Sequence, residues 1–332
     1  MPNAQKTVSF SELETWAPAG TTVAVLGLES SFHAGLYSAA MANLLPLNPQ
    51  LSQWNFVAVE ASPGNLREVI LKLHEKNVWG VILTRPFKSL ALQLLTAEYR
   101  TTGPIREENG APVSAIPPQI KPPIGTTEAL AERVGAVNLL TWRPNGYWGI
   151  STDGAAWLKA VESDLHTKVK GKTVIVIGAG AMARAVAVEA LQWGCRELWL
   201  GNRTQENAWD AIDQILPSMN MRGRTHTFNL LKPSPKVPRS ALIVNTLPIE
   251  ARDEGNPALD LTRFDRSSLY FDVSILPSVA NKTASSLDIM NCTGTHLWTH
   301  QILDHIERLI GVKPGFDFVQ WAVSEAAAAG RL

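Results

Sequence analysis

A glycine-rich loop near the middle of the chain has the residue types and spacing that bind a phosphate. A β-branched run at 173–177 predicts a buried strand, and the Ala- and Val-rich stretch after the loop predicts a helix that stops at Gly194. Gly178 permits a tight turn, Gly180 lets a pyrophosphate approach, and Ala183 allows close helix–strand packing. The pattern predicts a dinucleotide site at the helix N-terminus; the alternative is a strand–turn–helix without a ligand. The loop residues are Gly178, Ala179, Gly180, Ala181, Met182 and Ala183.

The end of the next predicted strand distinguishes between two dinucleotides. Residues 196–201 read as this strand, and Asn202-Arg203-Thr204 follow it. An NAD site places an acidic residue about 20 positions after the glycines, where it binds the ribose 2′-hydroxyl. Here an arginine stands in that region, and the first carboxylate is Glu206. Because a guanidinium binds a phosphate through two hydrogen bonds, Arg203 favours NADP; the alternative is an exposed arginine without a ligand.

Length, charge and composition restrict the class of protein. A chain of 332 residues predicts two domains, and an apolar content of 45% is ordinary for a globular protein. Thirty basic residues balance thirty acidic ones, which argues against nucleic-acid and membrane partners. Cys195 and Cys292 provide neither a disulfide framework nor a metal-ligand cluster. With no membrane-length apolar run and no signal peptide, we expect a cytoplasmic monomer or homodimer that acts on a small molecule.

Strand and helix patterns alternate before residue 100. A short helix is expected after Ser11, Ser62 is a candidate N-cap for a later helix, and another helix should follow 85–88. Such alternation predicts an α/β layer with parallel strands. Because this region has no glycine loop, we assign it to the substrate. The expected strands are 22–28, 54–60 and 79–84, and the expected helices are 34–45 and 63–76.

The segment 101–127 differs sharply in composition from its surroundings. Six prolines lie there among glycine, serine and charged residues. Proline lacks a backbone donor and interrupts helices and inner strands, so we expect a long surface loop inserted into the first domain. A proline-rich ligand for a partner protein is the weaker alternative.

Five blocks, in collinear order from about Thr22 to Leu309, resemble the shikimate dehydrogenase family and its quinate-using relatives. The family's Asn-Val-Thr-x-Pro-x-Lys block is similar to 82–88, and its Gly-Ala-Val-Asn block is intact at 135–138. Its Asn-Thr-Asp-Gly block is similar to 151–154. The glycine loop with its arginine resembles the family's NADP site, and the spacing of its C-terminal glycine and glutamine is also kept.

The resemblance implies a role for each matched residue. Lys88 and Asp153 would form a proton-transfer pair, because reduction of a ketone needs a proton at the developing alkoxide. No metal is implied. Substrate hydroxyls would be bound by Ser31, Thr84, Asn138 and Gln301. NADP would be bound by the glycine loop together with Asn202, Arg203, Thr204, Asn245, Thr246, Val273 and Gly294.

Two segments depart from the family pattern. Where the family binds the substrate carboxylate with a Ser-x-Ser pair, this chain has a shortened loop at 29–35. Ser31 is expected to keep one contact, and His33 either replaces the other as a cation or is an ordinary loop histidine. The family's substrate-binding tyrosine is Ile275 here, and a later threonine is Ala280. A pocket without these hydroxyls discriminates less well for a polyol acid, so the resemblance implies the chemistry but does not determine the substrate.

We therefore predict an α/β protein with an N-terminal substrate domain, a C-terminal Rossmann NADP-binding domain and a cleft between them. The substrate domain comprises 1–155 and about 296–332, and the NADP domain comprises 156–295. The expected activity is reversible NADP-dependent reduction of 3-dehydroshikimate to shikimate, or of a closely related cyclic hydroxy acid. One alternative is a paralogue with a different small hydroxy or amino acid substrate. The other is a non-catalytic protein that senses NADP or shikimate.

Overall fold

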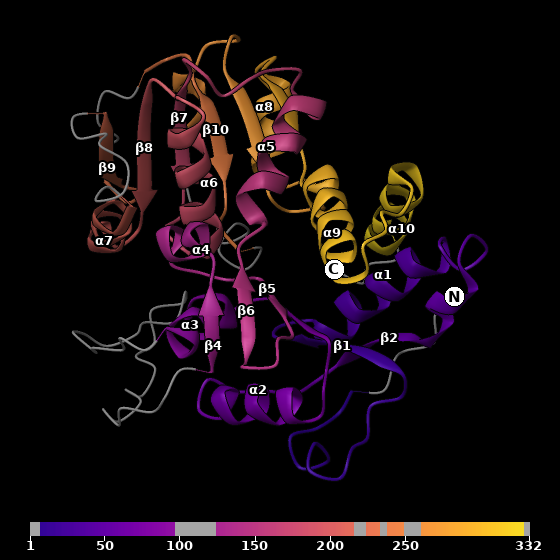
Figure 1. Ribbon diagram of the computed structural model, residues 1–332. Helices are drawn as coiled ribbons and strands as arrows, with labels where there is room; N and C mark the ends of the chain where they lie inside the picture. Colours follow the sequence, from indigo (N-terminus) through magenta and orange to yellow (C-terminus); the bar gives the residue numbers. More distant parts are fainter. Residues whose placement is uncertain (1–6, 97–123, 216–223, 233–237, 249–259, 329–332) are drawn as a thin grey trace. The chain divides into compact units, whose positions relative to one another are not determined.

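The chain divides into two compact α/β units. The computed structural model describes residues 7–96, 124–215, 224–232, 238–248 and 260–328 (Figure 1). The first unit comprises Met1–Thr152 and Ile302–Leu332, and the second comprises Asp153–Gln301. Each unit contains its own six-stranded sheet, which confirms the predicted fold class. Within the described ranges, no helix has the length and apolar character needed to cross a membrane.

The sheet of the first unit is mixed, with the strand order β2-β1-β3-β5-β6-β4. Strands β1, β2 and β3 are parallel, as expected, whereas β5 runs antiparallel to both β3 and β6. The parallel pairing predicted for the strands before residue 100 is therefore confirmed, and residues 139–150 add an antiparallel hairpin to the same sheet. The strands are β1 (Thr21–Leu26), β2 (Trp54–Ala58), β3 (Gly80–Leu83), β4 (Gly125–Thr127), β5 (Leu139–Thr141) and β6 (Tyr147–Ile150).

Helices cover both faces of this sheet. Ala24 and Val81 belong to a buried cluster that α2 and α3 complete on one face. Neighbouring strand residues point to the opposite face, where Tyr37 of α1 stacks on Phe56 with ring centroids 5.3 Å apart. The helices of this unit are α1 (Ser30–Ala42), the 3-10 helix η1 (Pro49–Gln53), α2 (Leu66–Glu75), α3 (Phe87–Leu95), α4 (Ala129–Val134) and α10 (Phe316–Ala328). Helix α9 (Thr295–Ile310) begins in the second unit and ends in the first.

Two local predictions in the first unit were wrong. The helix expected after Ser11 is a series of turns at 10–15, because a helix begun there would soon meet Pro18. Helix α2 starts at Leu66 with Asn65 as its N-cap, so Ser62 does not cap it. Instead, the Ser62 backbone N–H donates to Asn65 Oδ1 at 2.6 Å.

Most of the proline-rich segment, 101–123, lies outside the described residues. Its predicted end at 127 was placed too late, since Gly125–Thr127 form β4 and pair in parallel with β6. Strand β4 is the edge of the sheet. An edge strand tolerates proline close to its start because one side of its backbone needs no partner.

The sheet of the second unit is entirely parallel, with the order β9-β8-β7-β10-β11-β12. This is the doubly wound order 3-2-1-4-5-6, whose switch point lies between β7 and β10. Figure 1 shows α5 and α6 running beside this sheet. The strands are β7 (Thr173–Ile177), β8 (Glu197–Asn202), β9 (Thr225–Asn229), β10 (Leu242–Asn245), β11 (Leu269–Asp272) and β12 (Met290–Cys292). The helices are α5 (Asp153–Asp164), α6 (Ala181–Gln192), α7 (Gln205–Ile215), the 3-10 helix η4 (Leu261–Arg263) and α8 (Val279–Ser286).

Candidate functional site

The glycine loop joins β7 to α6 with the geometry that a pyrophosphate site needs. Gly178 has φ +111°, and a Cβ there would lie 2.4 Å from Thr246 Oγ1. Gly180 is the N-cap of α6 and supplies no side-chain hydrogen bond to it. The first N–H groups of the helix therefore depend on solvent or a ligand, and small side chains surround them. The cradle fits the phosphates of a dinucleotide.

The residues after β8 and β10 border the same end of the sheet. Arg203 is exposed, and its carbonyl oxygen accepts a hydrogen bond from Asn229 Nδ2 at 3.1 Å. Asn202 Nδ2 donates to Thr204 O at 2.9 Å, which holds the turn after β8. Thr246 Oγ1 donates to Ile177 O at 2.7 Å and so ties the end of β10 to β7. Arg203 is thus a cation on a backbone anchored next to the glycine loop's strand.

Asn245 is directed into the second unit by a buried polar network. Its Nδ2 lies 3.1 Å from both Tyr270 Oη and Asp272 Oδ2, and Ser278 Oγ donates to the same carboxylate oxygen at 2.8 Å. Asp272 is fully buried. The Asn245 side chain therefore shapes the end of β10, and its carbonyl oxygen accepts from Val273 N at 3.1 Å.

Val273 and Gly294 form a close backbone crossing. A Cβ on Gly294 would lie 2.2 Å from Val273 O, so only glycine fits there. Trp298 Nε1 donates to the same carbonyl at 3.2 Å. Ile275 nearby in the chain is buried, and no hydroxyl stands in its place.

Three predicted residues of the first unit lie on neighbouring segments. Lys88 is in the first turn of α3, and its carbonyl oxygen accepts from Val137 N at 3.0 Å. The Asn138 carbonyl accepts from Leu83 N at 2.9 Å, one residue before Thr84. The Thr84 hydroxyl donates to backbone carbonyls, that of Leu28 at 3.0 Å among them. Towards a ligand, Thr84 can therefore act only as an acceptor.

Asn138 is held by a partner that the sequence did not indicate. Its Nδ2 donates to Thr152 Oγ1 at 2.8 Å, and its Oδ1 accepts from Thr152 N at 2.9 Å. Thr152 Oγ1 lies 2.8 Å from His305 Nε2, and His305 Nδ1 lies 2.6 Å from Tyr37 Oη. The one sequence signal for His305 was its position four residues after Gln301, one helical turn away.

Asp153 and Gln301 meet inside the second unit. Gln301 Nε2 donates to Asp153 Oδ1, and both side chains are at least nine-tenths buried. Lys88 belongs to the first unit. The Lys88–Asp153 pairing therefore stays a prediction, whereas the carboxylate of Asp153 has an amide donor that orients it.

The segment expected to bind a carboxylate is helical. Ser31 and His33 lie in the first turn of α1, so the expectation of a loop at 29–35 was wrong. Ser31 is exposed and its Oγ lies 2.7 Å from Thr7 Oγ1. Burial, aided by the charges of Lys88 and Arg85, lowers the pKa of His33 to about 3. His33 is thus a neutral core histidine, and the hypothesis that it replaces a serine as a cation was wrong.

Lowering the pH should destabilise the protein through His33. In the unfolded chain a histidine has a pKa of about 6.5, so it is protonated as the pH falls below that value. In the folded protein His33 stays neutral until about pH 3. The free energy of unfolding should therefore fall as the pH falls through this window. For this one group, the loss from about pH 7 to about pH 5 should be about 2 kcal/mol.

Urea unfolding of His33→Leu at both pH values measures this contribution. The variant should lose less stability than the wild-type protein between the two conditions, by about 2 kcal/mol. His166→Leu, at an exposed position, is the matched control and should keep the wild-type dependence. An identical pH dependence in His33→Leu and the wild-type protein would contradict a buried neutral His33.

Metal binding has no support in the described part of the chain. No group of three or more His, Cys, Asp or Glu side chains is placed to hold an ion there. His296 Nδ1 instead contacts Asp164 Oδ1, which gives that histidine a local structural partner.

Comparisons with known proteins found similarity to shikimate dehydrogenases. A model of the shikimate / quinate 5-dehydrogenase family matches residues 160–231. The shikimate dehydrogenase (NADP(+)) of Desulforamulus reducens is 28% identical over 191 residues, 58% of this chain and 54% of that protein. The shikimate dehydrogenase (NADP(+)) of Methanosphaera stadtmanae is 22% identical over 268 residues, 80% of this chain and 83% of that protein.

The sequence match to the first of these relatives spans about half of that protein's length. The structural similarity covers a larger part of this chain. A crystal structure of a shikimate dehydrogenase in complex with NADP+ has a TM-score of 0.71 and 21% sequence identity to this chain. The match covers 92% of this chain and 95% of the chain in that crystal structure. At this identity the likeness shows the fold of both units, and the residues must supply the argument for function.

Proposed function

We propose that this chain, which resembles shikimate and quinate dehydrogenases in sequence and in fold, is an NADP-dependent oxidoreductase. The proposed reaction is the reversible reduction of 3-dehydroshikimate to shikimate, or of a closely related cyclic hydroxy acid. The observation that carries the proposal is the proximity of three segments of the first unit. Backbone hydrogen bonds join Leu83 to Asn138 and Val137 to Lys88, so the backbone of Lys88 lies beside the segments matched to substrate binding.

The dinucleotide has a suitable site in the second unit. Its pyrophosphate would be held by the loop from Gly178 to Ala183 and the N-terminus of α6. Arg203 would bind the 2′-phosphate, which is why we propose NADP and not NAD. When bound, NADP supplies or accepts the hydride.

The remaining chemistry belongs to side chains of this protein. In the reducing direction, Lys88 Nζ gives a proton to the oxygen of the ketone as it becomes an alkoxide, and in the oxidising direction Nζ takes the proton back. Asp153, oriented by Gln301, is the proposed partner of that ammonium. Thr84 and Asn138 are proposed to bind substrate hydroxyls, Thr84 as an acceptor.

A second candidate is the same chemistry on a different small hydroxy acid. Two findings favour it: His33 is neutral and buried, and Ile275 offers no hydroxyl. Both changes remove polar contacts that would otherwise select a carboxylated polyol. A non-catalytic sensor of NADP or shikimate is less well supported, because Lys88 and Asp153 are both present.

The test is a spectrophotometric assay of NADPH formation with shikimate, with quinate and NAD+ as the comparison pair. Turnover of shikimate with NADP+ on the order of 1–1000 per second would support the main proposal. NADP+ binding without turnover of either acid would contradict it, and a screen of cyclic hydroxy acids would then examine the second candidate.

A further inference from the structure

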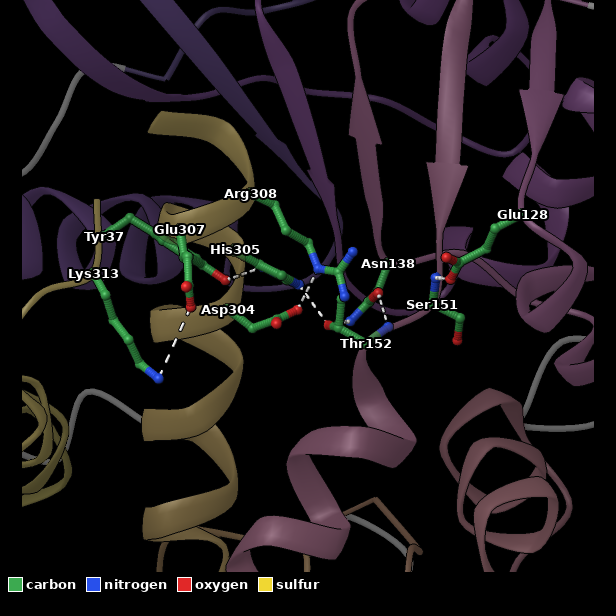
Figure 2. A network of polar contacts seen from close by, with 10 residues as sticks. All are labelled: Tyr37, Glu128, Asn138, Ser151, Thr152, Asp304, His305, Glu307, Arg308 and Lys313. Carbon is green, nitrogen blue, oxygen red and sulfur yellow. Dashed lines mark hydrogen bonds and ion pairs between the residues drawn. The ribbon is translucent and has the colours of Figure 1, made fainter. Parts of the chain in front are cut away.

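A chain of four buried polar side chains crosses the first unit between α1 and the end of β6. It consists of Tyr37, His305, Thr152 and Asn138, and each member is at least 95% buried (Figure 2). The successive heavy-atom distances are 2.6 Å from Tyr37 Oη to His305 Nδ1, 2.8 Å from His305 Nε2 to Thr152 Oγ1, and 2.8 Å from Thr152 Oγ1 to Asn138 Nδ2. Water does not screen hydrogen bonds at such depth, so each broken contact has a large effect.

The Asn138 end of this chain has only one satisfactory orientation. Its Oδ1 accepts from the Thr152 backbone N–H while its Nδ2 donates to Thr152 Oγ1. Turning the amide by 180° would set an NH2 group against that N–H and remove both bonds. The direction of the second Nδ2 hydrogen is therefore decided by Thr152.

His305 in turn is a buried hydrogen-bond partner of the Thr152 hydroxyl. Thr152 Oγ1 accepts from Asn138 Nδ2 and lies 2.8 Å from His305 Nε2, so the imidazole is the second buried hydrogen-bond partner of this hydroxyl. The other ring nitrogen, His305 Nδ1, lies 2.6 Å from Tyr37 Oη, so both nitrogens of the imidazole have hydrogen-bond partners. Tyr37 also stacks on the imidazole, with an interplanar angle of 8°, which holds the ring in place.

We propose that His305 is a positioning residue for substrate binding: through Thr152 it holds the Asn138 carboxamide in the orientation that binds a substrate hydroxyl. The inference rests on the proposed function, in which Asn138 contacts substrate. It adds a residue, one turn after Gln301 on α9, to the groups on which substrate affinity depends. A hydrocarbon at position 305 would remove the imidazole partner of the Thr152 hydroxyl, and the hydroxyl would then compete for other partners.

The activity test uses His305→Leu, His305→Gln and Thr152→Val in the full chain. His305→Leu should raise KM for shikimate about tenfold, the scale of one lost hydrogen bond, with kcat and the Kd of NADP+ changed less than about twofold. His305→Gln keeps an acceptor for Thr152 and should restore much of the loss. Arg308→Leu, an exposed position on the same helix paired with Asp304, is the matched control and should behave as wild type.

A double variant shows whether His305 acts through Thr152. Thr152→Val should raise KM by itself, and adding His305→Leu should change KM by less than about twofold further, since the shared path is already broken. Independent effects that multiply would overturn the proposal. So would an unchanged KM in His305→Leu, or an equal loss of NADP+ affinity. If His305→Leu does not fold, the KM values of Thr152→Val and Thr152→Ser are compared instead. Only the serine keeps the hydroxyl, so only Thr152→Val should raise KM.

A second measurement separates this proposal from the proposed function. The side-chain amide signals of Asn138, assigned by their loss in Asn138→Asp, should exchange with solvent at least about tenfold faster in His305→Leu than in the wild-type protein. This readout needs no substrate. Absence of shikimate turnover in the wild-type protein would refute the function, whereas unchanged exchange in His305→Leu would refute the positioning role.

Discussion

Replacing Lys88 by alanine is expected to reduce kcat for shikimate oxidation about a thousandfold. General acid–base catalysis contributes roughly 10²–10⁴ to a rate, and in the proposed mechanism Lys88 Nζ is the group that moves the proton. Lys88 lies in the first turn of α3 in the first unit, whereas the proposed cofactor site is in the second. The Kd of NADP+ should therefore change less than about twofold.

Steady-state kinetics and fluorescence titration with NADPH test this expectation. Lys88→Met, which keeps an unbranched side chain without the charge, should be as inactive as the alanine variant. Lys313→Ala, an exposed lysine of the same unit, is the control and should keep wild-type kinetics. A Lys88→Ala protein that turned over normally, or that lost cofactor binding instead, would contradict the assigned role.

Replacing Arg203 by alanine is expected to weaken NADP+ binding about 10- to 100-fold and to leave NAD+ binding nearly unchanged. The range corresponds to charge-assisted hydrogen bonds worth roughly 1.5–3 kcal/mol, which only a cofactor with a 2′-phosphate can form. The local backbone should survive the substitution, because Asn229 Nδ2 binds the carbonyl oxygen of residue 203 and not its side chain.

Separate titrations with NADP+ and NAD+ measure the discrimination between them. Arg266→Ala is the control in the same unit, since its guanidinium is exposed and pairs with Asp288. Arg203→Lys should recover part of the NADP+ affinity through its charge but not through a fork of two hydrogen bonds. Equal losses of affinity for the two dinucleotides would refute contact between Arg203 and the 2′-phosphate.

The nucleotide-binding half was predictable because its signals are local. The β-branched run became β7, Gly178 adopts the positive φ that its turn requires, and Gly194 ends the helix region with φ +75°. Each of these properties depends on a few neighbouring residues and on the absence of a Cβ. The strand that precedes Arg203 was likewise expected, with its bounds shifted by one residue.

The first unit was less predictable because its site depends on contacts between distant segments. The hairpin of β5 and β6 makes its sheet mixed, and the alternating pattern before residue 100 contains no information about it. His33 was expected in a loop as a candidate cation; packing of α1 against the sheet instead buries it and lowers its pKa to about 3.

The amino-acid sequence by itself determined the two-domain α/β class, the phosphate loop and the types of residue available for proton transfer. Only the tertiary structure decided which buried side chains form hydrogen bonds with these residues. Tyr37 and His305 are 268 residues apart, and they form one buried chain with Thr152 and Asn138. The physical reason is that backbone conformation follows from near neighbours, whereas burial and hydrogen-bond partners arise when distant segments exclude water from the same place.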